Sequence, residues 1–139
     1  MKVSPDKIAE LRVKNLEMIQ AIVTRTAGYS AGLKATTVTL VAALLGLALG
    51  LKLPSLLLSG LVPISGFAYL DARYLKTERW FRAHFREVAD EDWTTMPTFR
   101  LKLSADVPNS WWQAVSSWAI WPFYSLLAML LLLVWGLWR

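Results

Sequence analysis

The sequence has no cysteine and a single histidine, His84, among its 139 residues. The lack of cysteine excludes disulfides, thiolate nucleophiles and the usual zinc sites. No acid–base partner for His84 is evident, so we expect a packed or solvated ring rather than a catalytic one. The chain also has no nucleophile constellation, glycine-rich phosphate loop or metal-binding cluster in its sequence. We therefore expect no enzymatic activity, no bound metal and no cofactor.

Charged residues are missing from three long stretches of a chain that is 55% hydrophobic and has a mean hydropathy of +0.40. Seventeen uncharged residues lie between Lys34 and Lys52, 18 lie between Lys52 and Asp71, and 32 run from Val107 to Trp138. An α-helix needs about 20 apolar residues to cross a bilayer, and each stretch reaches or nearly reaches that length. The sequence thus predicts an all-α membrane protein with three transmembrane helices, none with a charge at its centre for a proton relay.

Prolines and charges near the ends of these stretches predict local structure. Pro54, just after Lys52, predicts a tight turn between the first two spans, and Pro63 predicts a kink in the second. Lys34 and Asp71 stand at the inner ends of the first and second spans. We expect these two side chains to form an ion pair.

Lysine and arginine are distributed unevenly around the spans. Residues 1–34 and 71–110 together contain 13 of the 15 lysines and arginines. The other two are Lys52 and Arg139. Because cytoplasmic flanks are rich in lysine and arginine, the N-terminus is predicted to be cytoplasmic and the C-terminus to lie across the membrane. Interfacial belts are predicted from the tryptophans at the two ends of the third span, which are Trp111, Trp112, Trp118 and Trp121 at one end and Trp135 and Trp138 at the other. A position deeper in the bilayer is the alternative for Trp118 and Trp121.

These patterns divide the chain into four segments. They are a cytoplasmic amphipathic helix at 1–34, a transmembrane hairpin at 35–70, a cytoplasmic helix and extended segment at 71–110, and a third transmembrane helix at 111–139. In the last part of the third segment, Phe99, Leu101 and Leu103 alternate with polar residues. That alternation predicts a short strand at 98–104.

The N-terminal segment has the start signal and the periodicity of a helix. Ser4 is a predicted N-cap, with Pro5 at the first helical position. One predicted apolar face contains Ile8, Leu11, Met18, Ile19 and Ile22. Asn15 falls within this face, at the spacing where a coiled coil places one polar residue to fix its register. Two alternatives stay open for the face: packing within its own subunit or on the membrane, and a seam between subunits.

The second span continues into a cationic, aromatic helix. Its ring-bearing face, from Leu70 to Val88, is predicted to pack against the N-terminal helix. A set of cations follows the end of the span: Arg73, Lys76, Arg79, Arg82 and Arg86. These side chains either face solvent and fix the topology, or bind an anionic ligand such as a nucleotide or oligonucleotide. Glu78, four residues before Arg82, is expected to neutralise part of this charge.

Small residues recur at helical spacing along the first span and its cytoplasmic approach. This small-residue stripe consists of Gly28, Gly32, Thr36, Thr39, Ala43, Gly46 and Gly50. Lipid chains gain little from such a face, whereas another helix can approach it closely. The stripe therefore predicts close helix packing. The alternative is a water path lined by Thr36, Thr37 and Thr39, which requires several subunits around an axis.

Three phrases carry a resemblance: "LEMIQAIVTR" at 16–25, "LKATTVTLVAALLGL" at 33–47 and "LDARYLKTERWFR" at 70–82. They resemble a family of small bacterial inner-membrane proteins encoded beside nucleotidyltransferases, in particular the membrane effector of the Hailong-type anti-phage system. The resemblance implies an oligomeric channel gated by an oligonucleotide signal. It also implies that 16–25 and 70–82 respond to the signal, that the first span contributes to the conducting path, and that the C-terminus is periplasmic.

Two functions are therefore kept open from the sequence. In the first, a homo-oligomer in the bilayer forms a channel that an oligonucleotide or cyclic nucleotide gates, with a nucleotidyltransferase encoded nearby as its partner. In the second, the protein is a non-conducting membrane scaffold or accessory subunit that recruits a soluble partner. A phage holin fits the size and the number of spans, but the charged terminal tail typical of holins is lacking.

Overall fold

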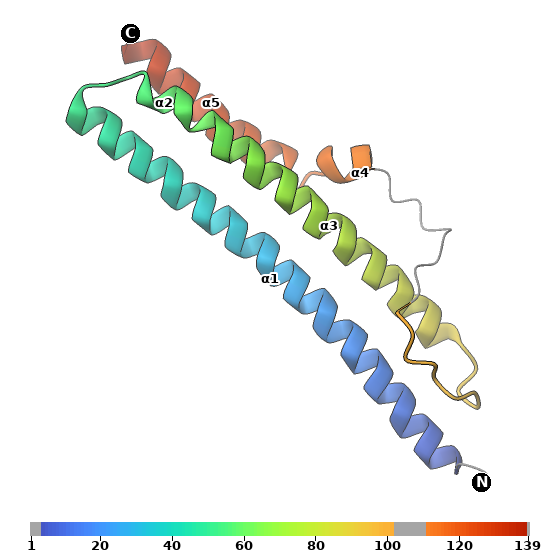
Figure 1. Cartoon of the computed structure of the whole chain (residues 1–139). Coiled ribbons are helices and arrows are strands. Elements are labelled where there is room, and N and C mark those ends of the chain that lie inside the picture. Colours follow the sequence, from blue (N-terminus) through green and yellow to red (C-terminus); the bar gives the residue numbers. More distant parts are fainter. Residues whose placement is uncertain (1–3, 102–110, 139) are drawn as a thin grey trace.

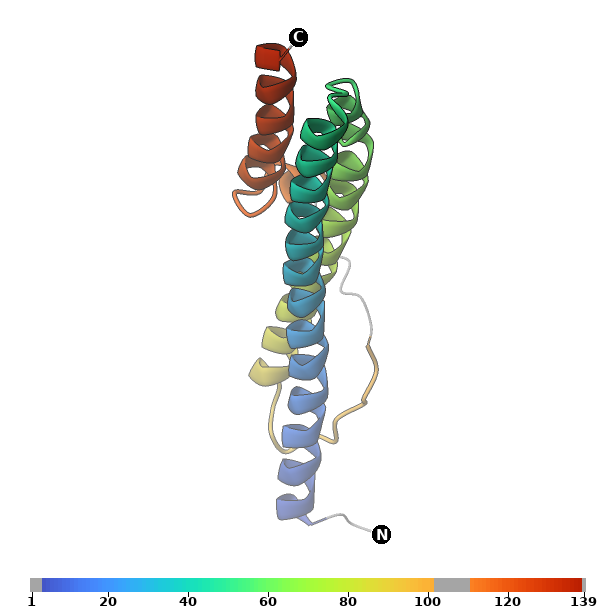
Figure 2. The same cartoon turned by 90° about the vertical axis from the view of Figure 1, so that its left-hand side faces the viewer.

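The computed structural model describes residues 4–101 and 111–138, and these residues form five helices. They are α1 (Pro5–Leu51), α2 (Leu56–Ser59), α3 (Leu61–Asp90), α4 (Trp111–Val115) and α5 (Trp121–Trp138). The long helices α1 and α3 lie side by side, and α5 lies beside the half that contains the turn between them (Figure 1, Figure 2). The described part of the chain contains no strand, so the prediction of an all-helical fold is confirmed there.

Helix α1 runs without a break for 47 residues, from Pro5 to Leu51. At a rise of about 1.5 Å per residue it is about 70 Å long. Its start is the predicted one, because the Ser4 side chain accepts a hydrogen bond from the backbone N–H of Lys7 at 3.4 Å. The predicted N-terminal helix and first span are thus parts of a single helix.

The turn predicted at Lys52 and Pro54 is present. Lys52 has a φ of 56°, in the left-handed region, and the N–H of Leu53 donates to the carbonyl of Ala48 at 3.1 Å. This αL arrangement is a common way to end a helix, because it satisfies carbonyls that the last turn leaves free.

Where Pro63 predicts a kink, α2 ends at Ser59 and α3 begins at Leu61, with Gly60 between them at a helical φ of −67° and ψ of −19°, so the kink itself stays a prediction. Pro63 lacks the N–H that a continuous helix would pair with the carbonyl of Ser59, and α2 ends at that serine. Pro63 therefore falls in the first turn of α3, where a missing donor costs little.

Two helices, α1 and α5, are long and apolar enough to cross a membrane, judged by length and composition. The predicted second span is divided between α2 and the first part of α3. It therefore stays a prediction.

The predicted strand at 98–104 is wrong for residues 98–101, which have no regular secondary structure. Phe99 has a φ of 50°, which interrupts the extended backbone that the alternating pattern requires. The remaining predicted positions, including Leu103, lie outside the described residues.

The segment predicted as one helix at 111–139 is interrupted. Helix α4 ends at Val115 and α5 begins at Trp121. Pro122 explains the break, because a continuous helix would bring its ring against the carbonyl of Trp118 and leave that carbonyl unpaired. The chain instead starts a new helix, with Pro122 in the first turn.

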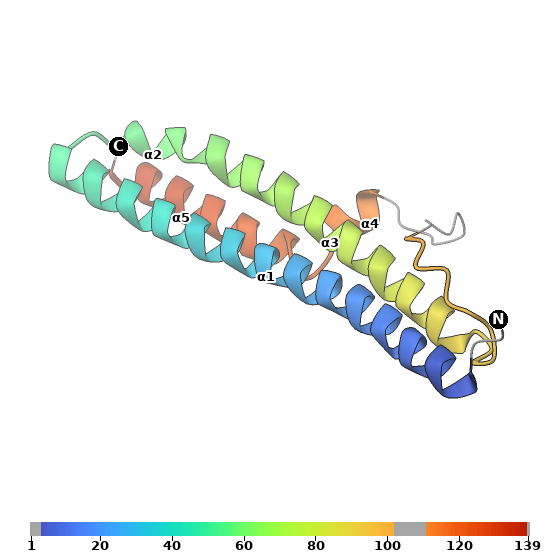
Figure 3. The same ribbon diagram turned by 60° about the horizontal axis from the view of Figure 1, so that its bottom comes forward.

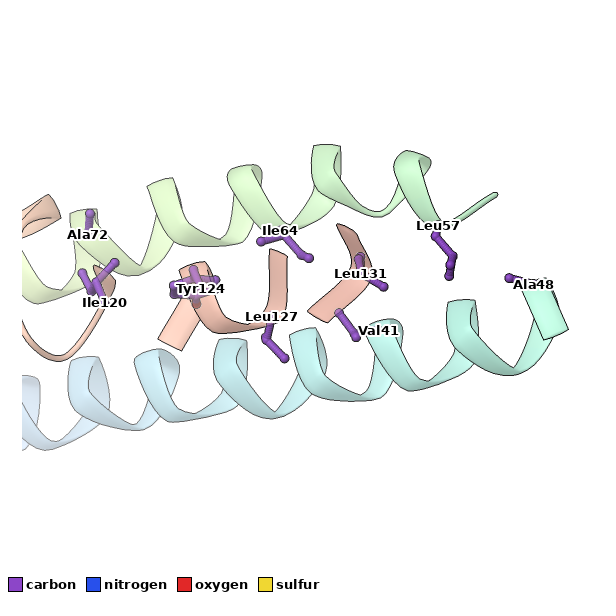
Figure 4. Close-up of a cluster of buried hydrophobic side chains, with 9 residues drawn as sticks. All are labelled: Val41, Ala48, Leu57, Ile64, Ala72, Ile120, Tyr124, Leu127 and Leu131. Carbon is purple, nitrogen blue, oxygen red and sulfur yellow. The ribbon is translucent and has the colours of Figure 1, made fainter. Parts of the chain in front are cut away.

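A cluster of buried apolar side chains joins α1, α3 and α5 (Figure 4). Its members are Val41, Ala48, Leu57, Ile64, Ala72, Ile120, Tyr124, Leu127 and Leu131. Gly60 permits the close approach, since a Cβ atom there would lie 2.7 Å from Leu131 Cδ1 and 2.8 Å from Leu44 Cδ1. Figure 3 shows α5 lying alongside both long helices at this level.

Candidate functional site

The small-residue stripe of α1 is exposed in the single chain at every position: Gly28, Gly32, Thr36, Thr39, Ala43, Gly46 and Gly50. A Cβ atom added at any of its four glycines would meet nothing within 4 Å. The hydroxyls of Thr36 and Thr39 donate to the carbonyls of Gly32 and Ala35, each at 3.0 Å. The described residues of the chain therefore leave this face uncovered.

The buried face of α1 lies on the opposite side of the helix. Thr37, Val41 and Ala48 are buried, and each is nine residues from a member of the stripe. Nine residues are about 2.5 helical turns, so the two sets face opposite directions. Thr37 is completely buried, so its inclusion in a water path is wrong for this arrangement of the chain. Thr36 and Thr39 keep the exposure that such a path requires.

The predicted ligand-binding cations of α3 are Arg73, Lys76, Arg79, Arg82 and Arg86. Arg79 donates to the carbonyl of Gln113 in α4 at 3.2 Å and to Ser117 Oγ, just after α4, at 3.0 Å. Arg82 forms the predicted ion pair with Glu78 at 2.7 Å. Arg79 thus contacts α4 and the turn after it, whereas Arg82 and Arg86 lie near Gln20 of α1 and Arg73 is exposed.

Arg82 and Arg86 line a hollow of about 180 Å³ together with Phe85 and with Gln20 of α1. Gln20 and Phe85 also border an open groove of about 680 Å³ that runs along α1. The other residues of the groove are Val13, Leu16, Glu17, Ala21, Thr24 and Arg25. Two guanidinium groups beside an aromatic ring and an amide can hold an anion against a flat apolar surface. The sequence did not indicate Gln20, because its role depends on how α1 and α3 are packed.

A polar cluster centred on Asp71 joins α1, α3 and α5, and we call it the Asp71 cluster. Asp71 is completely buried, and its Oδ2 lies 2.5 Å from Lys34 Nζ, so the predicted ion pair is confirmed. The hydroxyl of Tyr124 donates to the same oxygen at 3.2 Å, and Ser30 donates to Oδ1. The sequence analysis missed Tyr124, although a tyrosine within an apolar run needs a partner for its hydroxyl and could have been found by that signal.

Arg12 is the second buried charge, with 1% of its surface exposed. It donates to the carbonyl and hydroxyl of Thr95 at 2.9 and 2.8 Å, and to the Glu91 carboxylate at 3.2 Å. A longer contact, 3.4 Å, reaches the carbonyl of Val88 in the last turn of α3. From the sequence Arg12 was assigned only to the cytoplasmic charge count. Its position three residues before Asn15 and seven before Ile19 places it on the same helical face.

The buried face of the N-terminal part of α1 differs from the predicted one. Asn15 and Ile19 are buried as predicted, but Met18 is 37% exposed, and Val23 and Thr26 are buried further along. The face with Asn15 lies toward α3 of the same chain. Packing within the subunit is therefore the alternative that this fold favours.

The aromatic face of α3 meets α1 through Tyr74, whose ring lies 5.5 Å from that of Tyr29. His84 is packed, as predicted, and its ring stacks on Trp80 with centroids 5.8 Å apart. Its Nδ1 atom is 3.7 Å from Glu87, which is beyond hydrogen-bond distance. Residues 4–101 and 111–138 contain no group of three potential metal ligands close enough to bind an ion.

Compared with protein families, curated proteins and solved structures, the chain matches none.

Proposed function

We propose that several copies of the chain assemble in a bacterial inner membrane as a channel, with the small-residue stripe of α1 at the subunit contacts and along the conducting path. The observation that carries this proposal is the exposure of the whole stripe on the side of α1 away from its own partners. A second helix gains dispersion contacts against such a face, which lipid chains do not supply equally well. A few helices of one chain do not enclose a pore, so the path requires copies around a shared axis.

The proposed orientation has both cation-rich segments in the cytoplasm and the C-terminus in the periplasm. Its support is that the start of α1 and the end of α3 lie together, at the end of the molecule opposite to the end of α5 (Figure 1). Arg12 makes this contact directly with Val88. The positive-inside rule then assigns the shared end to the cytoplasm.

The proposed gating signal is a nucleotide or oligonucleotide, made by a nucleotidyltransferase encoded nearby. Two observations support it: the hollow formed by Arg82, Arg86, Phe85 and Gln20, and the resemblance of three segments to the Hailong-type membrane effector. A ligand changes the open fraction only if it binds one state more tightly, by about 1.4 kcal/mol for each tenfold bias. In the proposed function, opening depolarises the infected cell.

Leucine at Gly46 or Gly50 is expected to weaken self-association in detergent about tenfold or more, because the new side chains hold neighbouring helices apart. The wild-type protein should run as a defined oligomer by light scattering, and each variant should shift toward monomer. Conductance across liposome membranes should fall in parallel. Leucine is a better helix former than glycine, so these substitutions favour the helix itself.

The matched control is Val38→Leu, which enlarges an exposed residue of α1 outside the stripe. It should leave both the oligomer and the conductance intact. A monomeric wild-type protein, or liposomes that stay ion-tight under every condition, would contradict the channel.

Charge reversal at Arg82 and Arg86 is expected to weaken the response to the signal at least tenfold, because each charge-assisted hydrogen bond contributes about 1.5–3 kcal/mol. The measurement is ion flux from liposomes with added cyclic AMP, cyclic dinucleotides and short DNA and RNA oligonucleotides. Arg73→Glu is the matched control, since Arg73 is exposed on α3 and outside the hollow. An unchanged response of the double variant would remove the proposed ligand site.

The apolar groove along α1 favours a second candidate function, that of a non-conducting scaffold. The groove offers about 680 Å³ lined by residues such as Val13 and Leu16, which a soluble protein partner would cover. A single stoichiometric partner in a pull-down, without conductance, would favour the scaffold over the channel.

A further inference from the structure

Three tryptophan side chains, in α4, in the turn after it and at the first residue of α5, are largely exposed in the folded chain. The exposed fractions are 77% for Trp112, 89% for Trp118 and 63% for Trp121. In a soluble chain such exposure is unfavourable for large rings, whereas an indole at a membrane surface places its apolar body in hydrocarbon and its N–H at the headgroups. We call the segment from Trp111 to Trp121 the tryptophan elbow.

The tryptophan elbow is held against α3 by its other face. Ala114 is completely buried and Ile120 is 3% exposed. The ring of Trp111 lies 5.1 Å from that of Tyr69. Arg79 donates to the Gln113 carbonyl and to Ser117 Oγ, so it fixes the chain where α4 ends. The exposed indoles therefore stand on a fixed support.

The elbow lies where the apolar stretches of the chain end. The apolar stretch before Asp71 ends there in α3, and α5 begins at Trp121, three residues before Tyr124. Tyr124 contacts Asp71, and Asp71 contacts Lys34, so the corresponding ends of the three apolar stretches, within α1, within α3 and at the start of α5, are at one level. In Figure 1, α4 lies beside α3 near the beginning of α5. Arg73 and Arg79 lie just beyond this level, with the charge that complements anionic headgroups.

From this arrangement we infer that the tryptophan elbow docks into the headgroup layer of the bilayer. It lies along the membrane surface on the cytoplasmic side, and its indole N–H groups donate to lipid phosphates and carbonyls. The inference rests on the membrane placement in the proposed function, but not on a channel or on a ligand. It also gives Arg79 a positioning role toward the elbow instead of a ligand-binding role.

The absence of cysteine permits a direct test by site-directed spin labelling. Ser116→Cys and Ala119→Cys place labels at exposed positions of the elbow without removing a tryptophan. The full chain is reconstituted in liposomes of phosphatidylcholine and anionic phosphatidylglycerol. Accessibility to oxygen and to a water-soluble nickel chelate is then measured by power saturation. Reference labels are placed at Leu133 in α5 and at Met18 in α1, both of which are exposed.

The labels at 116 and 119 are expected to lie at headgroup depth, between the hydrocarbon value at 133 and the aqueous value at 18. Accessibility values equal to those at either reference position would overturn the docking of the elbow in the headgroup layer, and would leave the membrane placement of the chain intact. Nickel access at 133 equal to that at 18 would overturn the membrane placement as well. Failure of conductance with headgroup depth retained would contradict the channel alone.

A second arm tests whether the indoles hold the elbow at this depth. Serine at Trp112 and Trp118 together should shift the label at 116 toward the aqueous value. Trp93→Ser, which removes an exposed tryptophan outside the elbow, should leave it unchanged. An equal depth in all three proteins would show that the indoles do not anchor the segment.

Discussion

Replacing Asp71 by leucine, or Lys34 by methionine, is expected to lower the melting temperature in detergent by about 10 °C. Breaking a buried ion pair costs about 3–5 kcal/mol, because one charge stays behind without its partner. The lower end of this range applies here, since the Lys34 side chain is 26% exposed and can reach solvent. Asp71→Leu also removes the acceptor of the hydrogen bonds from Ser30 and Tyr124, so in this variant α5 should loosen together with α1. The measurement is thermal unfolding followed by circular dichroism.

The double variant with both Asp71→Leu and Lys34→Met is the decisive comparison. It removes both charges and replaces them by apolar groups, so it should be more stable than either single variant. Lys14→Met is the matched control, because it breaks the ion pair with Glu10 on the exposed surface of α1. That control should leave the melting temperature nearly unchanged. Single losses that add up in the double variant would contradict a coupled pair.

Arg12→Ala is expected to raise amide hydrogen exchange at least tenfold in residues 84–95 and in the first turns of α1. The guanidinium joins α1 to the end of α3 through Thr95, Glu91 and Val88. Hydrogen bonds to a charged group contribute about 1.5–3 kcal/mol each, and tenfold faster exchange corresponds to about 1.4 kcal/mol. The effect should stay local, because Val41, the first residue of α1 in the apolar cluster, lies about 40 Å further along the helix than Arg12.

Two further variants identify the cause of this effect. Arg12→Lys should give an intermediate result, because an ammonium group keeps the charge but cannot reproduce the fork of a guanidinium. Arg25→Ala removes an exposed arginine from the same helix and should leave exchange unchanged. Protection in Arg12→Ala equal to that of the wild-type protein would show that this contact does not hold the two helix ends together.

Local signals in the sequence were sufficient for several parts of the fold. Ser4 predicted the start of α1, and Lys52 with Pro54 predicted the turn that follows it. Lys34 and Asp71 were paired because both stand at the inner ends of apolar stretches. The first two predictions depend on a few neighbouring residues. The third depends on two charges that stand at corresponding ends of apolar stretches. A single sequence contains both kinds of information.

Other features depend on which helix faces which, and the sequence did not determine this. The pattern at 98–104 predicted a strand, but an alternating pattern forms a strand only with a pairing partner, and Phe99 has a left-handed φ. Pro122 is a signal for the break before α5, but the charge-free sequence around it led to the prediction of one long span. The contacts of Arg12 with Val88 and of Gln20 with the hollow depend on how α1 packs on α3, which brings together residues far apart in sequence.

The unbroken length of α1 has a mechanical consequence. The hollow near Gln20 and the far end of the stripe at Gly50 belong to one rod about 70 Å long, without a hinge between them. A stiff rod does not bend locally in response to a small push; it tilts or turns as a whole. Rotation of α1 about its own axis by one residue position, about 100°, would turn every residue of the small-residue stripe away from its present exposed direction at the same time. A rotation that begins beside the hollow therefore displaces the whole stripe, from Gly28 to Gly50, in one movement.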